Sequence, residues 1–84
     1  MYKVKIYVTL KESVLDPQGS AVTQSLHRLS FDEVRDVRIG KYMEVMIETD
    51  QDHLDTRVRE MCEKLLANTV IEDYRYEAEE VLPQ

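Results

Sequence analysis

The sequence predicts an α+β domain of βαββαβ order, in which a four-stranded antiparallel sheet carries two helices on one face in a ferredoxin-like arrangement. Three observations support this prediction. Several runs alternate apolar and polar residues, as strands with one buried face do, and two runs repeat apolar residues at helical spacing. The 84 residues also contain no linker, repeat or low-complexity segment, so we expect a single domain over residues 1–84.

The first strand and the first helix are expected on either side of the segment VLDPQG, residues 14–19. The strand covers residues 2–10, where five apolar residues alternate with polar ones. Asp16 can cap the helix, Pro17 suits its first position because the missing N–H would have no partner there, and Gly19 lets another surface approach the backbone. A common helix start would have the same features, so that interpretation also remains open.

The second and third strands are expected as a hairpin that turns near Gly40. Apolar residues precede the turn at Val34, Val37 and Ile39. After the turn, apolar residues alternate with mainly polar ones from Tyr42 to Thr49. The hairpin therefore supplies two neighbouring strands of the predicted sheet.

The second helix and the last strand complete the predicted order. Asp50 or Asp52 can cap a helix that ends near Asn68 and carries an apolar stripe, formed by Leu54, Val58, Met61, Cys62, Leu65 and Leu66. The last strand is expected over residues 70–78. Its alternation is interrupted at Glu72, which suggests a bulge at that position.

The face of the sheet without helices is expected to be mixed in character. It would present Lys3, Lys5, Tyr7 and Thr9 beside Tyr42, Glu44, Met46 and Glu48. A domain of this size buries only about 60–65% of the surface of its unfolded chain, so its core is thin and self-association would add burial. We therefore expect an oligomer with Tyr7, Tyr42 and Met46 in its interface; the alternative is a face that is simply solvated.

Charge and composition restrict the classes of partner. The net charge of −6 disfavours nucleic acid and anionic lipid, and no apolar run approaches the length of a membrane span, about 20 residues. Tyr7 with Lys3 and Lys5 could serve an RNA-binding sheet, but the last strand is strongly acidic. The lone Cys62 cannot form a disulfide within the chain, and a strand beginning at Tyr2 leaves no room for a signal peptide. We expect a cytoplasmic protein with protein partners.

The chain offers no evident catalytic, cofactor-binding or metal-binding residues. Cys62 lies on the apolar stripe of the second helix, where burial would raise its pKa and make it a poor nucleophile. His27 and His53 lack the spacing of metal ligands, and no glycine-rich phosphate loop is present. A βαββαβ domain of this kind could also be a small-molecule-sensing regulatory module, and that alternative stays open.

Three ordered motifs make the chain resemble a known family over nearly its whole length. They are VLDPQG at residues 14–19, VRIGK at residues 37–41 and LLANTVIEDY at residues 65–74. On these motifs the chain resembles the PurS family, the small subunit of phosphoribosylformylglycinamidine synthase in purine biosynthesis. The chain departs from the family pattern at Ser30, where glycine is frequent, and at Thr69, where proline is frequent.

The resemblance implies a non-catalytic subunit, a homodimer or higher oligomer, that bridges a glutaminase subunit and a synthetase subunit and supports ammonia transfer between them. It also implies that ATP and magnesium belong to the synthetase and that this chain binds no cofactor alone. The complex as a whole would be an ATP-dependent ligase of the glutamine amidotransferase type. The motif residues are then candidates for partner contact: Asp16, Gln18 and Gly19 before the first helix, and Arg38, Gly40 and Lys41 at the expected hairpin.

Overall fold

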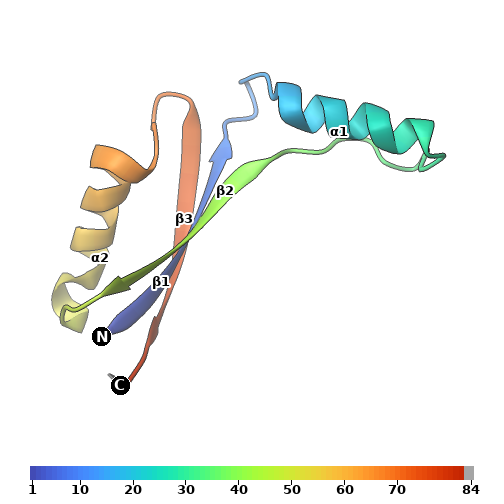
Figure 1. Ribbon diagram of the computed structural model, residues 1–84. Helices are drawn as coiled ribbons and strands as arrows, with labels where there is room; N and C mark the ends of the chain where they lie inside the picture. The colour runs from blue at the N-terminus through green and yellow to red at the C-terminus, as the bar shows by residue number, and fades with distance from the viewer. Residues whose placement is uncertain (83–84) are drawn as a thin grey trace.

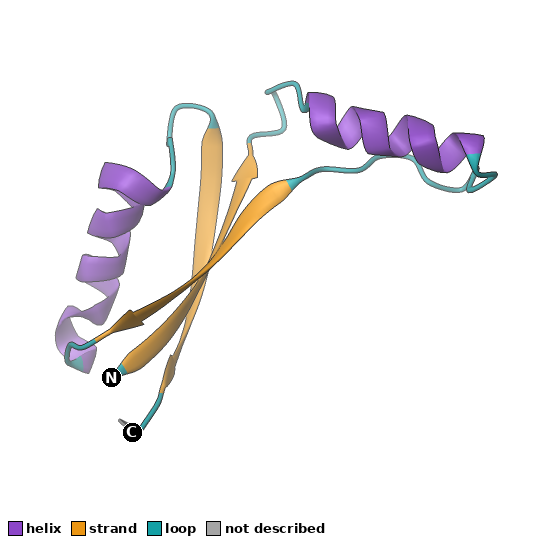
Figure 2. Cartoon of the chain, viewed as in Figure 1, coloured by secondary structure: helices purple, strands orange, loops and turns teal. Residues whose placement is uncertain are grey.

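A computed structural model of the chain describes residues 1–82 and confirms the α+β class. The three strands are β1 (Tyr2–Leu10), β2 (Gly40–Ile47) and β3 (Glu72–Glu80), and they form one antiparallel sheet in the order β2-β1-β3. Helix α1 (Pro17–Arg28) follows β1, and helix α2 (Gln51–Met61) follows β2 and continues as a short π-helix, η1 (Cys62–Leu66) (Figure 1, Figure 2). None of the helices within residues 1–82 is long and apolar enough to cross a membrane.

An aspartate caps each helix: α1 begins after the predicted cap Asp16, and α2 begins after Asp50, one of the two caps that the sequence left open. The Asp16 carboxylate accepts from the N–H of Gly19 at 2.9 Å, and Pro17 occupies the first turn of α1. The Asp50 carboxylate accepts from the N–H of His53, also at 2.9 Å. These bonds satisfy N–H groups that have no partner inside the helix.

The core lies between the sheet and α2. Val4, Ile6 and Val8 of the central strand are fully buried, as are Val58 and Cys62 of the helical segment above them. The alternation of β1 therefore directs every second side chain against α2. Burial raises the pKa of the Cys62 thiol, as its place on the apolar stripe predicts.

The prediction of a fourth strand is wrong, because residues 34–39 pair with no strand within the described chain. Gly40 is the first residue of β2 rather than a turn, and the chain runs from residue 39 into the strand without reversing. A Cβ atom at Gly40 would lie 2.4 Å from the carbonyl oxygen of Val8. The glycine is therefore needed for the close approach of β1 and β2, and the sequence alone could not separate this role from a turn.

The prediction that both helices cover one face of the sheet is also wrong. Only α2 packs on the sheet. Helix α1 and the segment after it, which leads into β2, extend away from one end of the sheet (Figure 1). That segment stays with α1: the His27 ring Nε2 lies 2.7 Å from the carbonyl oxygen of Val34, and Gly19 packs against the carbonyl of Val37. Helix α1 therefore packs with residues 34–39, and both lie outside the core.

Candidate functional site

The segments VLDPQG and VRIGK, far apart in sequence, are joined by the side chain of Asp16. One carboxylate oxygen accepts from the N–H of Gly19, and the other accepts from the N–H of Ile39 at 2.8 Å. Asp16 is 6% exposed, and these two backbone bonds hold its pKa below the usual range. A single buried carboxylate therefore fixes the start of α1 against the chain that enters β2.

Gly19 allows this close approach. A Cβ atom at this position would lie 2.0 Å from the carbonyl oxygen of Val37 and 2.6 Å from the Asp16 carboxylate. The sequence predicted that Gly19 admits another surface to the backbone, and the structure shows that this surface belongs to the same chain. Gly19 is itself buried, so its first role is to pack α1 against residues 37–39.

Arg38 is tied to the β1–α1 connection. Its Nη2 atom lies 2.9 Å from the carbonyl oxygen of Lys11, 3.2 Å from that of Val14 and 3.3 Å from that of Leu10. The guanidinium thus ties the chain that enters β2 to the end of β1 and to the connection that follows it. Arg38 therefore has a structural role within the chain. Its contact with a partner subunit stays a prediction.

A hollow of about 240 Å³ lies where these segments meet, on the helix-bearing side of the sheet. It brings together most of the residues that the sequence proposed for partner contact. Its lining residues from the first two motifs are Asp16, Gln18, Ile39, Gly40 and Lys41, and the strands add Val8, Leu10 and Glu72. Gly19 and Arg38 lie outside its lining.

Glu72 is the residue of this site that sequence reasoning missed. It accepts from the N–H of Asn68 at 2.7 Å and pairs with the Lys41 ammonium at 3.4 Å. The Asn68 bond, and then Lys41, hold the pKa of Glu72 below its usual range. The interruption of the last strand's alternation at Glu72 was the available signal, because an acid at an inward strand position needs such partners.

All three motifs therefore converge on one place, since Asn68 and Glu72 belong to LLANTVIEDY. Both oxygens of Asp16 are already occupied, and Glu72 is only 13% exposed in its side chain. Lys41, with 59% of its side chain exposed, and the exposed Gln18 remain accessible at the rim. A cation and an amide at the rim of a hollow suit recognition of a protein surface.

The open face of the sheet lies on the other side and has the predicted composition on β1 and β2. Lys3 faces Met46, Lys5 faces Glu44 and Tyr7 faces Tyr42. The two tyrosine rings are 5.1 Å apart between centroids, and the Arg75 guanidinium stacks on Tyr7 at 3.9 Å. Tyr42 and Met46 are 50% and 54% exposed, so an apolar and aromatic area remains accessible on this face.

Tyr42 also donates a hydrogen bond to the Glu44 carboxylate at 2.7 Å, and this bond raises the pKa of Tyr42 to about 12. Lys3 pairs with Glu44 at 3.5 Å. The polar groups on this face are thus largely paired with one another. Such a surface can meet another protein without leaving these charges unpaired.

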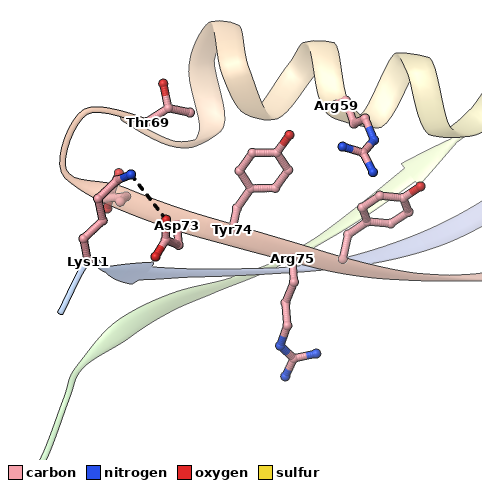
Figure 3. Close-up of a pocket in the computed structure, with 8 residues that line it drawn as sticks. Lys11, Arg59, Thr69, Asp73, Tyr74 and Arg75 are labelled. Atoms are coloured by element: carbon pink, nitrogen blue, oxygen red, sulfur yellow. Dashed lines mark ion pairs between the residues drawn. The ribbon is translucent and has the colours of Figure 1, made fainter.

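A larger hollow of about 590 Å³ lies beside β3 and the turn before it (Figure 3). Its cations already have partners: Lys11 pairs with Asp73 at 3.5 Å, and Arg59 binds Asp55 at 3.0 Å. Arg75 points away from Tyr74, to the other side of the strand (Figure 3). None of the residues that the sequence proposed lines this hollow, so its size does not make it the better candidate.

The described residues offer no catalytic constellation at either hollow. Within residues 1–82, no group of three or more histidine, cysteine or acidic side chains could hold a metal ion. His53 lies against its own cap residue, Asp50, and the Cys62 thiol is buried in the core. The residues present can recognise a surface, and they lack the paired base and nucleophile that covalent catalysis requires.

Comparisons with known proteins agree with the three motifs. A family model described as PurS, phosphoribosylformylglycinamidine (FGAM) synthase, matches residues 3–80. The chain is 71% identical over 84 residues to the phosphoribosylformylglycinamidine synthase subunit PurS of Bacillus subtilis, covering 100% of both chains. Its fold matches the structure of B. subtilis PurS with a TM-score of 0.88, at 72% identity over 95% of this chain and 100% of that one. A chain in the structure of PurLQS from Thermotoga maritima matches with a TM-score of 0.81, at 27% identity over 92% of this chain and 95% of that one.

Proposed function

This chain belongs to the PurS family of phosphoribosylformylglycinamidine synthase subunits, and from this premise we propose how it serves such an enzyme. It acts as a non-catalytic bridge that holds a glutaminase subunit and a synthetase subunit in a fixed relation. A PurLQS structure from T. maritima contains a chain of the same fold, which supports the proposal that this chain acts as one subunit of a larger complex. The role belongs to purine biosynthesis, and we expect it to take place in the cytoplasm.

One observation carries this proposal: three motifs from separate parts of the chain meet at one hollow that lacks catalytic groups. Asp16, Arg38 and Gly19 hold the segments together, while Lys41 and Gln18 are exposed at the rim. A site built to catalyse would need a nucleophile or a general base with a shifted pKa near substrate. A site built to dock needs a rigid frame with a few accessible polar groups.

The bridge contributes geometry to ammonia transfer. Ammonia released from glutamine is a small, freely diffusing molecule, so a second active site captures it efficiently only if water is kept from the route and the two sites are fixed. A subunit can meet that need without supplying an acid, base or nucleophile. We assign ATP and magnesium to the synthetase partner.

The proposed assembly also includes self-association. The area around Tyr7, Tyr42 and Met46 on the open face is a candidate surface between copies. A homodimer or larger oligomer would present several bridging sites to the two enzyme subunits. The ion pairs of Lys3 and Lys5 around this area would then form its polar rim.

Co-purification tests the bridge directly. The chain is mixed with affinity-tagged glutaminase and synthetase subunits from the same organism, with glutamine and ATP present, and the captured complex is weighed by light scattering. We expect a complex that contains all three proteins. Failure to form any complex, or turnover of glutamine or ATP by the purified chain alone, would refute the proposal.

A matched pair of variants locates the docking site. Lys41→Glu reverses a charge at the rim and removes an ion pair to Glu72, whereas Lys11→Glu reverses a charge and removes an ion pair to Asp73, the next residue of β3. We expect weaker capture for Lys41→Glu and normal capture for Lys11→Glu. Equal capture of both variants would move the docking site away from this hollow.

A further inference from the structure

The outer edge of β3 is open along its whole length. In the sheet order β2-β1-β3, strand β3 pairs only with β1 among residues 1–82. Just before the strand, the N–H of Lys11 bonds to the carbonyl of Ile71 at 2.9 Å. Just after it, the N–H of Val81 bonds to the carbonyl of Met1, also at 2.9 Å. The nine residues of β3 are therefore held straight on one side and leave an edge of about 30 Å on the other.

The alternation of hydrogen bonds shows which backbone groups face outward. In an antiparallel ladder, residues that bond to the neighbouring strand alternate with residues that point away from it. Because Ile71 and Val81 both bond to the β1 side, the odd-numbered residues of β3 face β1. The N–H groups of Tyr74, Tyr76 and Ala78 therefore face the open edge. An edge of this kind can pair with an extended segment of another protein.

The hollow of about 590 Å³ lies beside this edge (Figure 3). Tyr74 and Tyr76 of β3 line it together with Arg59 of α2. Its wall is fixed, because the Asp55 carboxylate of α2 binds Arg59 at 3.0 Å and accepts a hydrogen bond from the Tyr76 hydroxyl. A strand added to β3 would direct every second side chain toward this preformed hollow.

The charge of this edge is strongly one-sided. Strand β3 holds five acids and one arginine, so it carries −4 of the net charge of −6. Strand β2, at the other edge, holds one lysine and one glutamate. The side chains of Asp73, Glu77 and Glu79 are 54% to 67% exposed although each has a cation within 4.0 Å. Such exposed ion pairs are weak, so the carboxylates stay available to a partner. We define the acidic edge as the outer edge of Glu72–Glu80 with the hollow beside it.

The acidic edge disfavours a second copy of this chain as its occupant. If two copies paired antiparallel through β3 with Tyr76 at the centre, Asp73 of one copy would face Glu79 of the other. Like charges directly opposite each other destabilise a strand pair. A strand with basic side chains would instead gain from the same positions, so charge complementarity selects a different protein.

We propose that the acidic edge binds an extended basic segment of one enzyme subunit, which adds to β3 as a fourth strand. Lysine or arginine side chains of that segment would meet Asp73, Glu77 and Glu79. The alternate side chains, apolar or aromatic, would enter the hollow beside Tyr74. Main-chain bonds to the outward N–H groups supply affinity in this mode of recognition, and the alternate side chains supply specificity.

This inference rests on the proposed bridging function and gives it a second docking surface. A bridge needs separate contacts with two subunits. The rim at Lys41 presents a cation and the acidic edge presents carboxylates, so the two surfaces select partners of opposite charge. They meet at Glu72, from which the acidic edge runs to Glu80 at the other end of the sheet. Reversal at Lys11 adds an acid beside this edge, which agrees with the normal capture expected of Lys11→Glu.

Charge reversal tests the acidic edge. The tagged glutaminase and the tagged synthetase are used separately to capture the full chain, with and without Glu77→Lys and Glu79→Lys together. We expect capture of one subunit to weaken by about tenfold or more, because like charges then meet across the interface. Capture of the other subunit should change less than about twofold. Wild-type capture of the affected subunit should also weaken as salt is raised.

Asp32→Lys with Glu33→Lys is the matched control. It makes the same change of charge at two exposed residues after α1, far along the chain from β3, and should leave both captures unchanged. Equal weakening by the two double variants would show a general charge effect and overturn the inference. A changed mass of the Glu77→Lys, Glu79→Lys chain alone in sedimentation would assign the edge to a second copy and also overturn it.

Amide hydrogen exchange tests strand addition without any substitution. In the complex with the affected subunit, the amides of Tyr74, Tyr76 and Ala78 should become protected, whereas the inward amides of Arg75 and Glu77 are protected with or without it. Unchanged exchange at the three outward amides would overturn strand addition. If neither subunit captures the wild-type chain, the proposed bridge itself fails. If both capture it and charge reversal at β3 affects neither, the bridge stands and the acidic edge is refuted.

Discussion

The Asp16 carboxylate lies 2.8 Å from the backbone nitrogen of Ile39 and ties the start of α1 to the chain entering β2. The same side chain caps the helix through Gly19. Because one group makes both contacts, the geometry of the candidate site depends on Asp16 as well as on Gly19 and Arg38. The substitution of Asp16 therefore gives the first prediction.

Asp16→Ala should lower the melting temperature by several degrees at neutral pH. The folded-state pKa of Asp16 lies below its ordinary value of 3.8, so its stabilising effect is complete above that value and is lost as pH falls through the lower folded pKa. The difference between wild type and variant in thermal melts should therefore be constant near neutral pH and shrink in strong acid. Glu12→Ala, at an exposed site in the connection, is the control. A difference that grew on acidification would contradict this account.

Gly19→Ala should destabilise the fold by about 2 kcal/mol, because the added Cβ would overlap a backbone carbonyl that cannot rotate away. The predicted contact is with Val37 oxygen, 2.0 Å from the built Cβ. Urea unfolding measures the loss, and Ser20→Ala at the next, exposed position should change stability by less than about 0.5 kcal/mol. Equal unfolding midpoints for both variants would show that the contact between α1 and the Val37 carbonyl adjusts to the added Cβ without loss of stability.

Ser30→Gly should stabilise the chain by about 1 kcal/mol, since Ser30 is the one described non-glycine residue with a positive φ, 74°. It follows α1, where glycine commonly ends a helix, and the family resemblance also indicates glycine here. Within α1, Ser20→Gly should instead cost about 0.5 kcal/mol. Thermal melts that show the same sign for both changes would exclude strain at Ser30.

Much of this fold follows from the sequence because its signals are local. The alternation of residues 2–10 and the caps at Asp16 and Asp50 depend only on neighbouring residues, and the structure confirms them. The segment from Val34 to Ile39 is different. It has strand-like apolar residues, but periodicity cannot reveal whether a paired edge belongs to the same chain. Gly40 compounded the error, because a glycine for close approach and a glycine for a turn look alike in sequence.

The candidate site shows the same division. Its motif residues were recognisable, and all six proposed partner-contact residues lie in or directly around the junction of Asp16 with residues 37–41. The internal bonds of Arg38 were not foreseen, because a guanidinium that binds carbonyl groups leaves no pattern in the residues near it. The only sequence signal of Glu72 was a break in the apolar alternation of the last strand, which does not indicate its partners Lys41 and Asn68.

Met46→Asp should reduce assembly through the open face, because it places an unpaired charge on a surface that otherwise balances its charges. Burial of that charge against another copy would weaken the contact by about 2–3 kcal/mol. Sedimentation should show any assembly of copies becoming smaller. Leu82→Asp, at a site 87% exposed beyond β3, should have no effect. An unchanged assembly in Met46→Asp would place further association elsewhere.

The last prediction separates the supply of ammonia from its use, and it uses Lys41 because Arg38 has internal bonds that its reversal would break. Lys41→Glu should lower glutamine-dependent synthesis by the reconstituted complex, because charge complementarity at the rim is lost. Synthesis with ammonia supplied directly should stay near the wild-type rate, since the substrate and ATP sites of the synthetase are unaltered. Glu72→Gln removes the intrachain ion-pair partner of Lys41 but leaves the positive charge of Lys41 in place. The Glu72→Gln chain should therefore retain glutamine-dependent activity. Equal losses with glutamine and with ammonia would argue against a bridging defect, and full glutamine-dependent activity from a folded Lys41→Glu chain would show that docking does not use this residue.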